Sequence, residues 1–210
     1  MAKPTSPTEI VNLALRLLKT DPVLSIDPPD DDSKEAEAGA AWYDQARREV
    51  LEDHPWNFAS KRASIASDAD APEFEYTARY ELPADFIRLN RIGENWDDPE
   101  QDYEIEGDYI LANVDTPLML VYVWDIETVS KFSAKFVHAL ACRLATLMAY
   151  ELTGNASLVD VMSTEYDKAL TSAESVDGQN RPTRRIQRSK LREARGNMAR
   201  GRNWRTWGPD

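Results

Sequence analysis

Hydrophobic residues recur every three or four positions in four separate stretches of the chain, a spacing that places them on one face of an α-helix. The stretch after residue 130 is the clearest. Phe136, Leu140 and Leu144 keep this spacing there, and Gly154 is suited to end the helix. The pattern predicts helices over about 7–19, 33–53, 131–153 and 156–175.

The spacing changes to a period of two in the middle of the chain, which is typical of strands with one buried face. Tyr76, Ala78 and Tyr80 alternate with polar residues. The run "DYEIEGDYILA" predicts a hairpin that turns at residues 106–108, and "PLMLVYVW" predicts a further strand. We therefore expect three to five short antiparallel strands, inserted at about 74–125 between the second and third helices.

The connections between these elements lead to a predicted architecture. Only Gly154 and Asn155 separate the last two helices, which are therefore expected to be antiparallel neighbours. We predict an α+β protein, an antiparallel four-helix bundle with a small antiparallel β insert and an extended basic C-terminal tail. Residues 1–180 are expected to form one domain, and residues 181–210 a basic C-terminal extension.

Charge is distributed unevenly between these two parts of the chain. Residues 181–210 carry ten Arg and Lys residues against two acidic ones, a net charge of +8, whereas residues 1–180 have a net charge of −20. Such asymmetry is typical of an interaction tail. Trp204 and Trp207 stand among the arginines. This combination suits nucleic-acid binding and, equally, docking on an acidic or concave protein surface.

Cysteine usage and the length of the apolar runs indicate the environment of the protein. The single Cys142 excludes an internal disulfide and suits a reducing compartment. The N-terminus has no apolar core of signal-peptide length, and "PLMLVYVW" is far shorter than a bilayer span. We therefore expect a protein that is made in a cytoplasm and has no membrane partner.

Motifs for catalysis or cofactor binding are missing from the sequence. His54 ends a predicted helix and His138 lies among apolar residues in another, so both are expected to be structural. The run "DPPDDD" lacks the Gly and Glu spacing of a calcium loop and stands where a helix start favours acidic residues. No pair of carboxylates is singled out for glycoside hydrolysis. The expectation is a protein that is not an enzyme and needs no cofactor or metal.

The segment "HPWNF" combines a helix-breaking proline with two aromatic residues. Pro55 is expected to stop the helix and to force an extended path, which would point Trp56 and Phe58 to one side and Asn57 to the other. The Asn57 amide would then satisfy free backbone groups at the helix end. These four residues predict a packed structural corner that joins the second helix to the sheet.

Several segments resemble, in the same order, the tail tubular protein or head-to-tail adaptor family of short-tailed phages. They are "EIVNLALRLL", the helix that ends in "HPWNFA", the strand turn "YELPADFIRL", and "KFSAKFVHALACRLATLMAYELTGN" with the helix after it. Together they cover residues 8 to about 175. The family's corner is matched by Pro55, Trp56, Asn57 and Phe58, and its strand turn by Tyr80, Leu82, Pro83, Asp85 and Arg88.

The resemblance implies a structural virion protein without a catalytic site. Proteins of this family form a ring, typically of twelve copies, that lies between the portal and the tail nozzle, completes the head and lets DNA pass. The implied partners are the portal protein, the tail nozzle protein, further copies of the chain and phage DNA. The implied location is the head–tail interface of the virion, after synthesis in the host cytoplasm. An acidic body suits such a channel, because like charge disfavours tight contacts with DNA phosphates.

The basic extension is the predicted portal-docking element, because Arg and Trp are the anchors most common in strong interfaces. The candidate anchors are Arg184, Arg185, Arg188, Arg192, Trp204 and Trp207. Two other functions stay open at this point. One is a virion-associated peptidoglycan hydrolase that uses unidentified carboxylates, and the other is a DNA-binding accessory factor that acts through residues 181–210.

Overall fold

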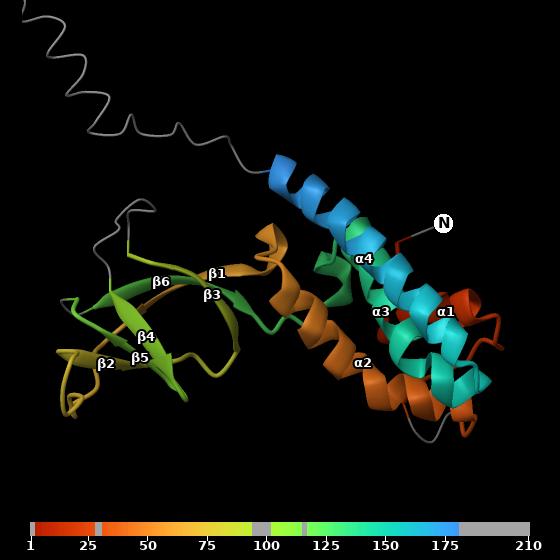
Figure 1. Cartoon of the computed structure of the whole chain (residues 1–210), viewed down its shortest axis with the longest axis horizontal. Helices are drawn as coiled ribbons and strands as arrows, with labels where there is room; N and C mark the ends of the chain where they lie inside the picture. Colours follow the sequence, from red (N-terminus) through yellow and green to blue (C-terminus); the bar gives the residue numbers. More distant parts are fainter. Residues whose placement is uncertain (1–2, 28–30, 94–101, 115–116, 181–210) are drawn as a thin grey trace, which may run out of the picture. The chain divides into compact units, whose positions relative to one another are not determined.

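The helices lie where the hydrophobic spacing predicts them. The structure, a computed structural model, describes residues 3–27, 31–93, 102–114 and 117–180 (Figure 1). These residues form four α-helices, and α4 runs four residues beyond its predicted end. The helices are α1 (Pro7–Leu18), α2 (Lys34–Asp53), α3 (Ala134–Thr153) and α4 (Ala156–Gln179).

Short polar side chains begin the helices. Ser6 accepts a hydrogen bond from the Glu9 backbone N–H at 3.3 Å, and Pro7 occupies the first helical position of α1. Ser33 does the same for α2, accepting from the Ala36 backbone N–H at 3.2 Å. These caps satisfy N–H groups that have no partner within the helix.

Helix α3 is the centre of the helical part. Ten of its fourteen residues from Phe136 to Ala149 are buried, as expected of a helix that packs against several neighbours, whereas His138 is exposed. It packs along α1, α2 and α4, whereas α1 and α2 contact each other much less. Close approach of α1 to α2 depends on Gly39, because a Cβ atom there would lie 2.7 Å from a methyl carbon of Val11.

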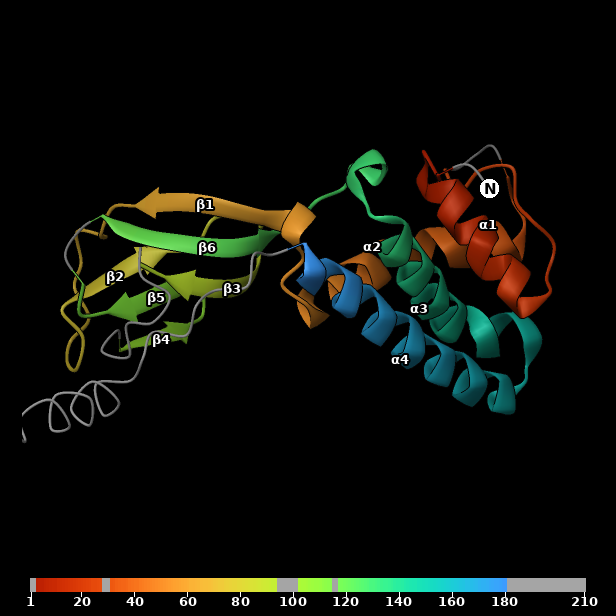
Figure 2. The ribbon, with the colours of Figure 1, turned by 90° about the horizontal axis from the view of Figure 1, so that it is seen from above.

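The described strands form two three-stranded antiparallel sheets. Sheet A has the order β1-β6-β3 and sheet B the order β2-β5-β4. Figure 2 shows β1 and β6 in one layer above β2, β5 and β4. The strands are β1 (Ser60–Ile65), β2 (Ala78–Glu81), β3 (Phe86–Ile92), β4 (Tyr103–Glu106), β5 (Tyr109–Ala112) and β6 (Leu118–Trp124).

The two sheets pack on each other around a hydrophobic core of their own. Tyr80 and Ile110 from sheet B share this core with Leu118, Leu120 and Tyr122 from sheet A. A separate and larger core lies among the helices, and strand β6 contributes to both. The strand region is therefore a two-layered unit with its own buried interior.

The predicted architecture of a four-helix bundle with a small β insert is wrong. The class is α+β, but the strands are substantial and start with β1 at Ser60, well before the predicted insert at 74–125. The sequence does not predict strand β1, because "SKRASI" contributes only two apolar side chains to the core, Ala63 and Ile65, too weak an alternation to recognise. The predicted extended tail lies outside the described residues.

Candidate functional site

Trp56 is the centre of the predicted corner. It is fully buried, and its indole N–H donates to the Val50 backbone carbonyl at 2.7 Å. Val50 lies in the last turn of α2, where carbonyls have no partner within the helix, so the indole satisfies one of them. The Trp56 ring meets Phe136 of α3 edge-on, with ring centroids 5.1 Å apart. This side chain therefore joins the end of α2 to α3.

The sequence predicts an extended path after Pro55, and this prediction is wrong. Residues Asn57–Ala59 form a short 3₁₀ helix, η1, which leads into β1. Phe58 packs on Phe136 and Phe132, with ring centroids 5.0 and 5.9 Å apart. Aromatic pairs at such distances add to the stabilisation from burial. The predicted packed corner is present, but it is built on a tight turn.

Asn57 binds a different helix from the one predicted. Its backbone N–H donates to the two carboxylate oxygens of Asp177 at 3.2 and 3.1 Å, and its side-chain amide donates to the Asp177 backbone carbonyl at 2.6 Å. His54 also contacts this carboxylate, at 3.3 Å from Nε2. Asp177 lies in the last turn of α4. The corner thus holds the last turn of α4, the final helix among the described residues.

Free backbone groups at the end of α2 are satisfied by Arg88 of β3, and not by Asn57 as the sequence predicts. The Arg88 guanidinium donates to the backbone carbonyls of Glu52 and Asp53 at 2.8 and 3.0 Å. A cation is favourable there, because the carbonyl end of a helix carries partial negative charge. Arg88 therefore attaches sheet A to α2.

Asp85, also in the strand-turn motif, connects the loop before β3 to strands β1 and β6. It accepts hydrogen bonds from Lys61 of β1 at 2.6 Å and from the Tyr122 hydroxyl of β6 at 2.8 Å. Partial burial pushes the pKa of Asp85 up, but these two hydrogen bonds outweigh it and hold the pKa below its usual value. Tyr80, in the same motif, is fully buried and donates to the Val114 carbonyl at 2.7 Å. These motif residues hold the sheets together.

A buried ion pair between α2 and the end of β6 was not predicted. Arg47 is 2% exposed, and its guanidinium contacts the Asp125 carboxylate and donates to the Ile126 carbonyl at 3.0 Å. Arg48 pairs with the same carboxylate at 2.7 Å. Burial raises the pKa of Asp125, but hydrogen bonds from the two arginines outweigh it and lower the pKa overall. The only signal in the sequence is that Arg47 falls at helical spacing with apolar residues of α2, such as Tyr43 and Val50, which are buried in the structure.

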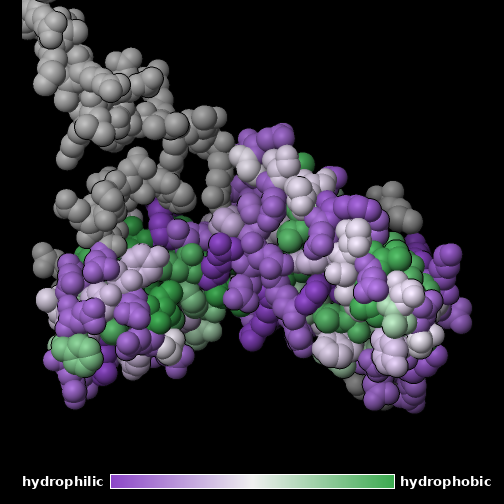
Figure 3. All heavy atoms as spheres, viewed as in Figure 1, coloured by the Kyte–Doolittle hydropathy of each residue, from purple (hydrophilic) through white to green (hydrophobic). Residues whose placement is uncertain are grey.

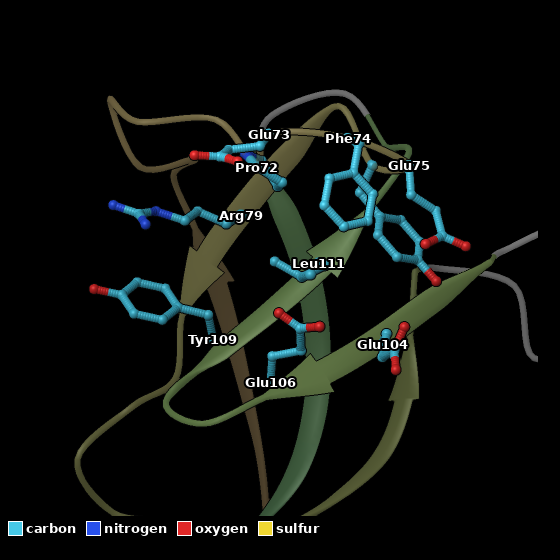
Figure 4. A pocket seen from close by; sticks show the side chains of 10 residues that line it. Pro72, Glu73, Phe74, Glu75, Arg79, Glu104, Glu106, Tyr109 and Leu111 are labelled. Carbon is cyan, nitrogen blue, oxygen red and sulfur yellow. The ribbon is translucent and has the colours of Figure 1, made fainter.

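Sheet B carries a pocket of about 290 Å³ on its outer face. Figure 4 shows Leu111 between the ring of Phe74 and the Arg79–Tyr109 pair, with Glu104 and Glu106 along one side. The Arg79 guanidinium lies over the Tyr109 ring, 4.8 Å from its centroid. Both glutamates are exposed, whereas the general acid of a glycosidase lies in apolar surroundings.

The described residues contain no group of three or more His, Cys, Asp or Glu side chains placed to hold a metal ion. Within these same residues, no helix is both long and apolar enough to span a membrane. Cys142 is buried, and burial raises the pKa of its thiol to about 11, as fits a packing residue. His138 lies 4.0 Å from the Cys142 sulfur.

The six predicted portal-binding residues in the basic extension, Arg184, Arg185, Arg188, Arg192, Trp204 and Trp207, lie outside the described residues. No family model matches the chain, and no curated protein matches it. The four corner residues are described, and the structure brings them into contact with α2, α3 and α4.

Proposed function

We propose that this protein is the head-to-tail adaptor of a short-tailed phage, a structural virion protein that forms a ring between portal and tail nozzle. DNA passes through the ring during ejection. The proposal starts from the ordered set of motifs that resembles the adaptor family. The basic extension is its portal-docking element, and the acidic body surrounds the channel.

One observation supports the proposal beyond the resemblance: the motif residues make the contacts that connect different helices and strands. Trp56 joins α2 to α3, Asn57 joins the corner to α4, and Arg88 joins β3 to α2. Each contact connects elements far apart in sequence. Contacts of this kind hold the helices and sheets of the fold in fixed positions, as a subunit of a rigid assembly requires. This supports an architectural role for the chain.

The test is the mass of the protein alone and after mixing with its cognate portal ring. A net charge of −12 makes separate copies repel one another, so we expect the isolated protein to be largely monomeric. With the portal present, the measured mass should increase by the mass of a closed ring of copies. Stable rings of the pure protein in light scattering would contradict the template requirement. Absence of any portal complex would refute the proposed function.

Two control assays distinguish the alternative functions. A zymogram on peptidoglycan tests the hydrolase, which predicts clearing without any portal. A gel-shift titration at increasing salt tests the DNA-binding factor, which predicts tight binding at low salt that falls steeply as salt rises. The adaptor predicts no clearing in the first assay and portal binding that does not require DNA.

A further inference from the structure

The outer faces of the two sheets carry opposite charge. The described strands of sheet A contain no Asp or Glu and four Lys or Arg residues, of which Lys61 binds Asp85 and Arg88 binds the end of α2, so Arg62 and Arg91 carry the charge of the outer face. The strands of sheet B contain three glutamates and one arginine. Because alternate side chains of a strand point to opposite faces, the charge of each outer face can be assigned from the strand register.

The basic face of sheet A is centred on one row of side chains across the three strands. Arg62 of β1 and Arg91 of β3 both pair in register with Val121 of the central strand β6. The two arginines therefore flank an apolar centre. Arg62 is exposed, and among the residues that the structure describes no carboxylate forms an ion pair with it.

A hollow of about 500 Å³ lies on this basic face. Its lining includes both arginines and the side chain of Met119, which is 43% exposed. A cationic rim around an apolar floor suits a partner with an apolar group surrounded by carboxylates. We refer to the residues that form this surface as the basic face, namely Arg62, Ser64, Arg91, Met119 and Val121.

The acidic face of sheet B has the complementary features. Glu104 and Leu111 pair in register, as do Glu106 and Tyr109, which places both glutamates on the outer face. Phe74, in the loop before β2, is 76% exposed. Arg79, the cation of this face, already pairs with Asp68 at 3.0 Å. The acidic face is formed by Glu73, Phe74, Glu75, Glu104 and Glu106.

Hydrophobic residues also remain on the surface around the strands, among predominantly hydrophilic neighbours (Figure 3). An exposed phenylalanine beside four carboxylates matches a hollow with an apolar floor between two arginines. The sheets pack on each other through their inner sides, so these two faces lie on opposite sides of the two-layered unit. One copy cannot bring them together.

We propose that the basic face of one copy binds the acidic face of the next copy in a head-to-tail contact. Such a contact joins two different surfaces, and it generates a ring where the rotation between successive copies closes. The inference rests on the proposed function, since it names the surfaces through which the ring subunits meet. It differs from a two-fold contact, which would oppose like faces and so place like charges together.

The small size of the faces agrees with assembly on a template. Three strands spaced ~4.8 Å apart and about six residues long cover roughly 14 by 20 Å, or on the order of 300 Å². Stable interfaces usually bury about 800 Å² on each partner. The contact between sheets alone is therefore weak, and ring closure on a portal supplies the effective concentration that makes it persist.

Charge reversal on each face separately tests the contact. The first variant is Arg62→Glu, which removes the net positive charge of the basic face, and the second combines Glu104→Lys with Glu106→Lys, which removes the net negative charge of the acidic face. Both change exposed side chains, so their melting temperatures should match that of the wild type. Each variant alone should bind portal rings with an apparent affinity at least ~10-fold lower, because residue 62 of one copy then faces residues 104 and 106 of like charge on the next.

Two rescue experiments make the result specific. An equal mixture of the two variants should assemble on portals, because in alternating copies residue 62 faces residues 104 and 106 of opposite charge at every contact. One chain that carries all three substitutions should assemble by itself for the same reason. The matched control for the second variant is Asp160→Lys with Asp167→Lys on the exposed side of α4, which gives the same charge change and should assemble like the wild type.

The outcomes separate this inference from the proposed function. If wild-type protein forms no portal complex, the proposed function fails. If wild type assembles and both face variants assemble equally well, the head-to-tail contact is refuted and the adaptor role stands. If the face variants lose portal assembly and neither the mixture nor the triple variant restores it, the pairing of the two faces is also refuted. Loss in the α4 control would attribute the effect to overall charge and refute it likewise.

Discussion

Replacing Trp56 by Ala removes the side chain that joins the corner to the helical core. Trp56 is fully buried, contacts Phe136 edge-on, and donates a 2.7 Å hydrogen bond to the Val50 carbonyl. Truncating a buried aromatic costs about 3–5 kcal/mol. The Val50 carbonyl also loses a buried donor, which adds on the order of 1 kcal/mol. The total is a large share of the roughly 5–15 kcal/mol that stabilises a domain.

Thermal and urea unfolding measure this loss. In a domain of this size, 1 kcal/mol corresponds to about 2–4 °C, so Trp56→Ala should lower the melting temperature by roughly 10–20 °C. Trp56→Phe keeps most of the apolar volume but lacks the indole N–H, and it should lose about 2 kcal/mol. The order of the two variants tests both parts of the reasoning, packing and hydrogen bonding.

Trp42 provides the matched control, because its indole N–H donates to the exposed Glu151 carboxylate at 3.1 Å and its ring is half-buried. Trp42→Ala should cost at most about 2 kcal/mol. If Trp56→Ala melted like the wild type and failed only on the portal, Trp56 would be an interface anchor. The structural role of the corner would then be refuted.

Two further predictions concern the extension and the buried ion pair. Deleting residues 181–210 should leave the melting temperature nearly unchanged, because the attraction between this basic segment and the acidic body is weak and screened by salt, and should abolish portal binding. Truncated protein that saturates portal rings with wild-type affinity would disprove docking through the extension; the DNA-binding alternative predicts intact portal binding and lost salt-sensitive DNA retention. Asp125→Asn should cost about 3–5 kcal/mol in urea unfolding, because Arg47 keeps a buried charge without its carboxylate. The folded-state pKa of Asp125 is lowered, so the wild type keeps this stabilisation above about pH 4 and loses it as pH falls further. The variant should lack that acid-side loss, and parallel pH curves for the two proteins would contradict the assignment.

Local patterns in the sequence determined the helices and the hairpin. Ser6 and Pro7 mark the start of α1, and Gly154 with a left-handed backbone ends α3, as their chemistry predicts. The β4–β5 hairpin turns at Gly107, whose φ of 56° favours glycine. These features depend on residues within a few positions of each other. Side-chain spacing and backbone preference are therefore enough to place them.

Only the tertiary structure decided how these elements combine. Strand β1 has a weak alternation of its own and is defined by its pairing with β6. Asn57 meets Asp177 and Arg47 meets Asp125 across long separations, which no local spacing encodes. The opposite charges of the two outer faces likewise follow from strand order and register. Each of these features depends on which distant segments share a core. Burial of apolar surface selects those segments, whereas the preferences of neighbouring residues do not.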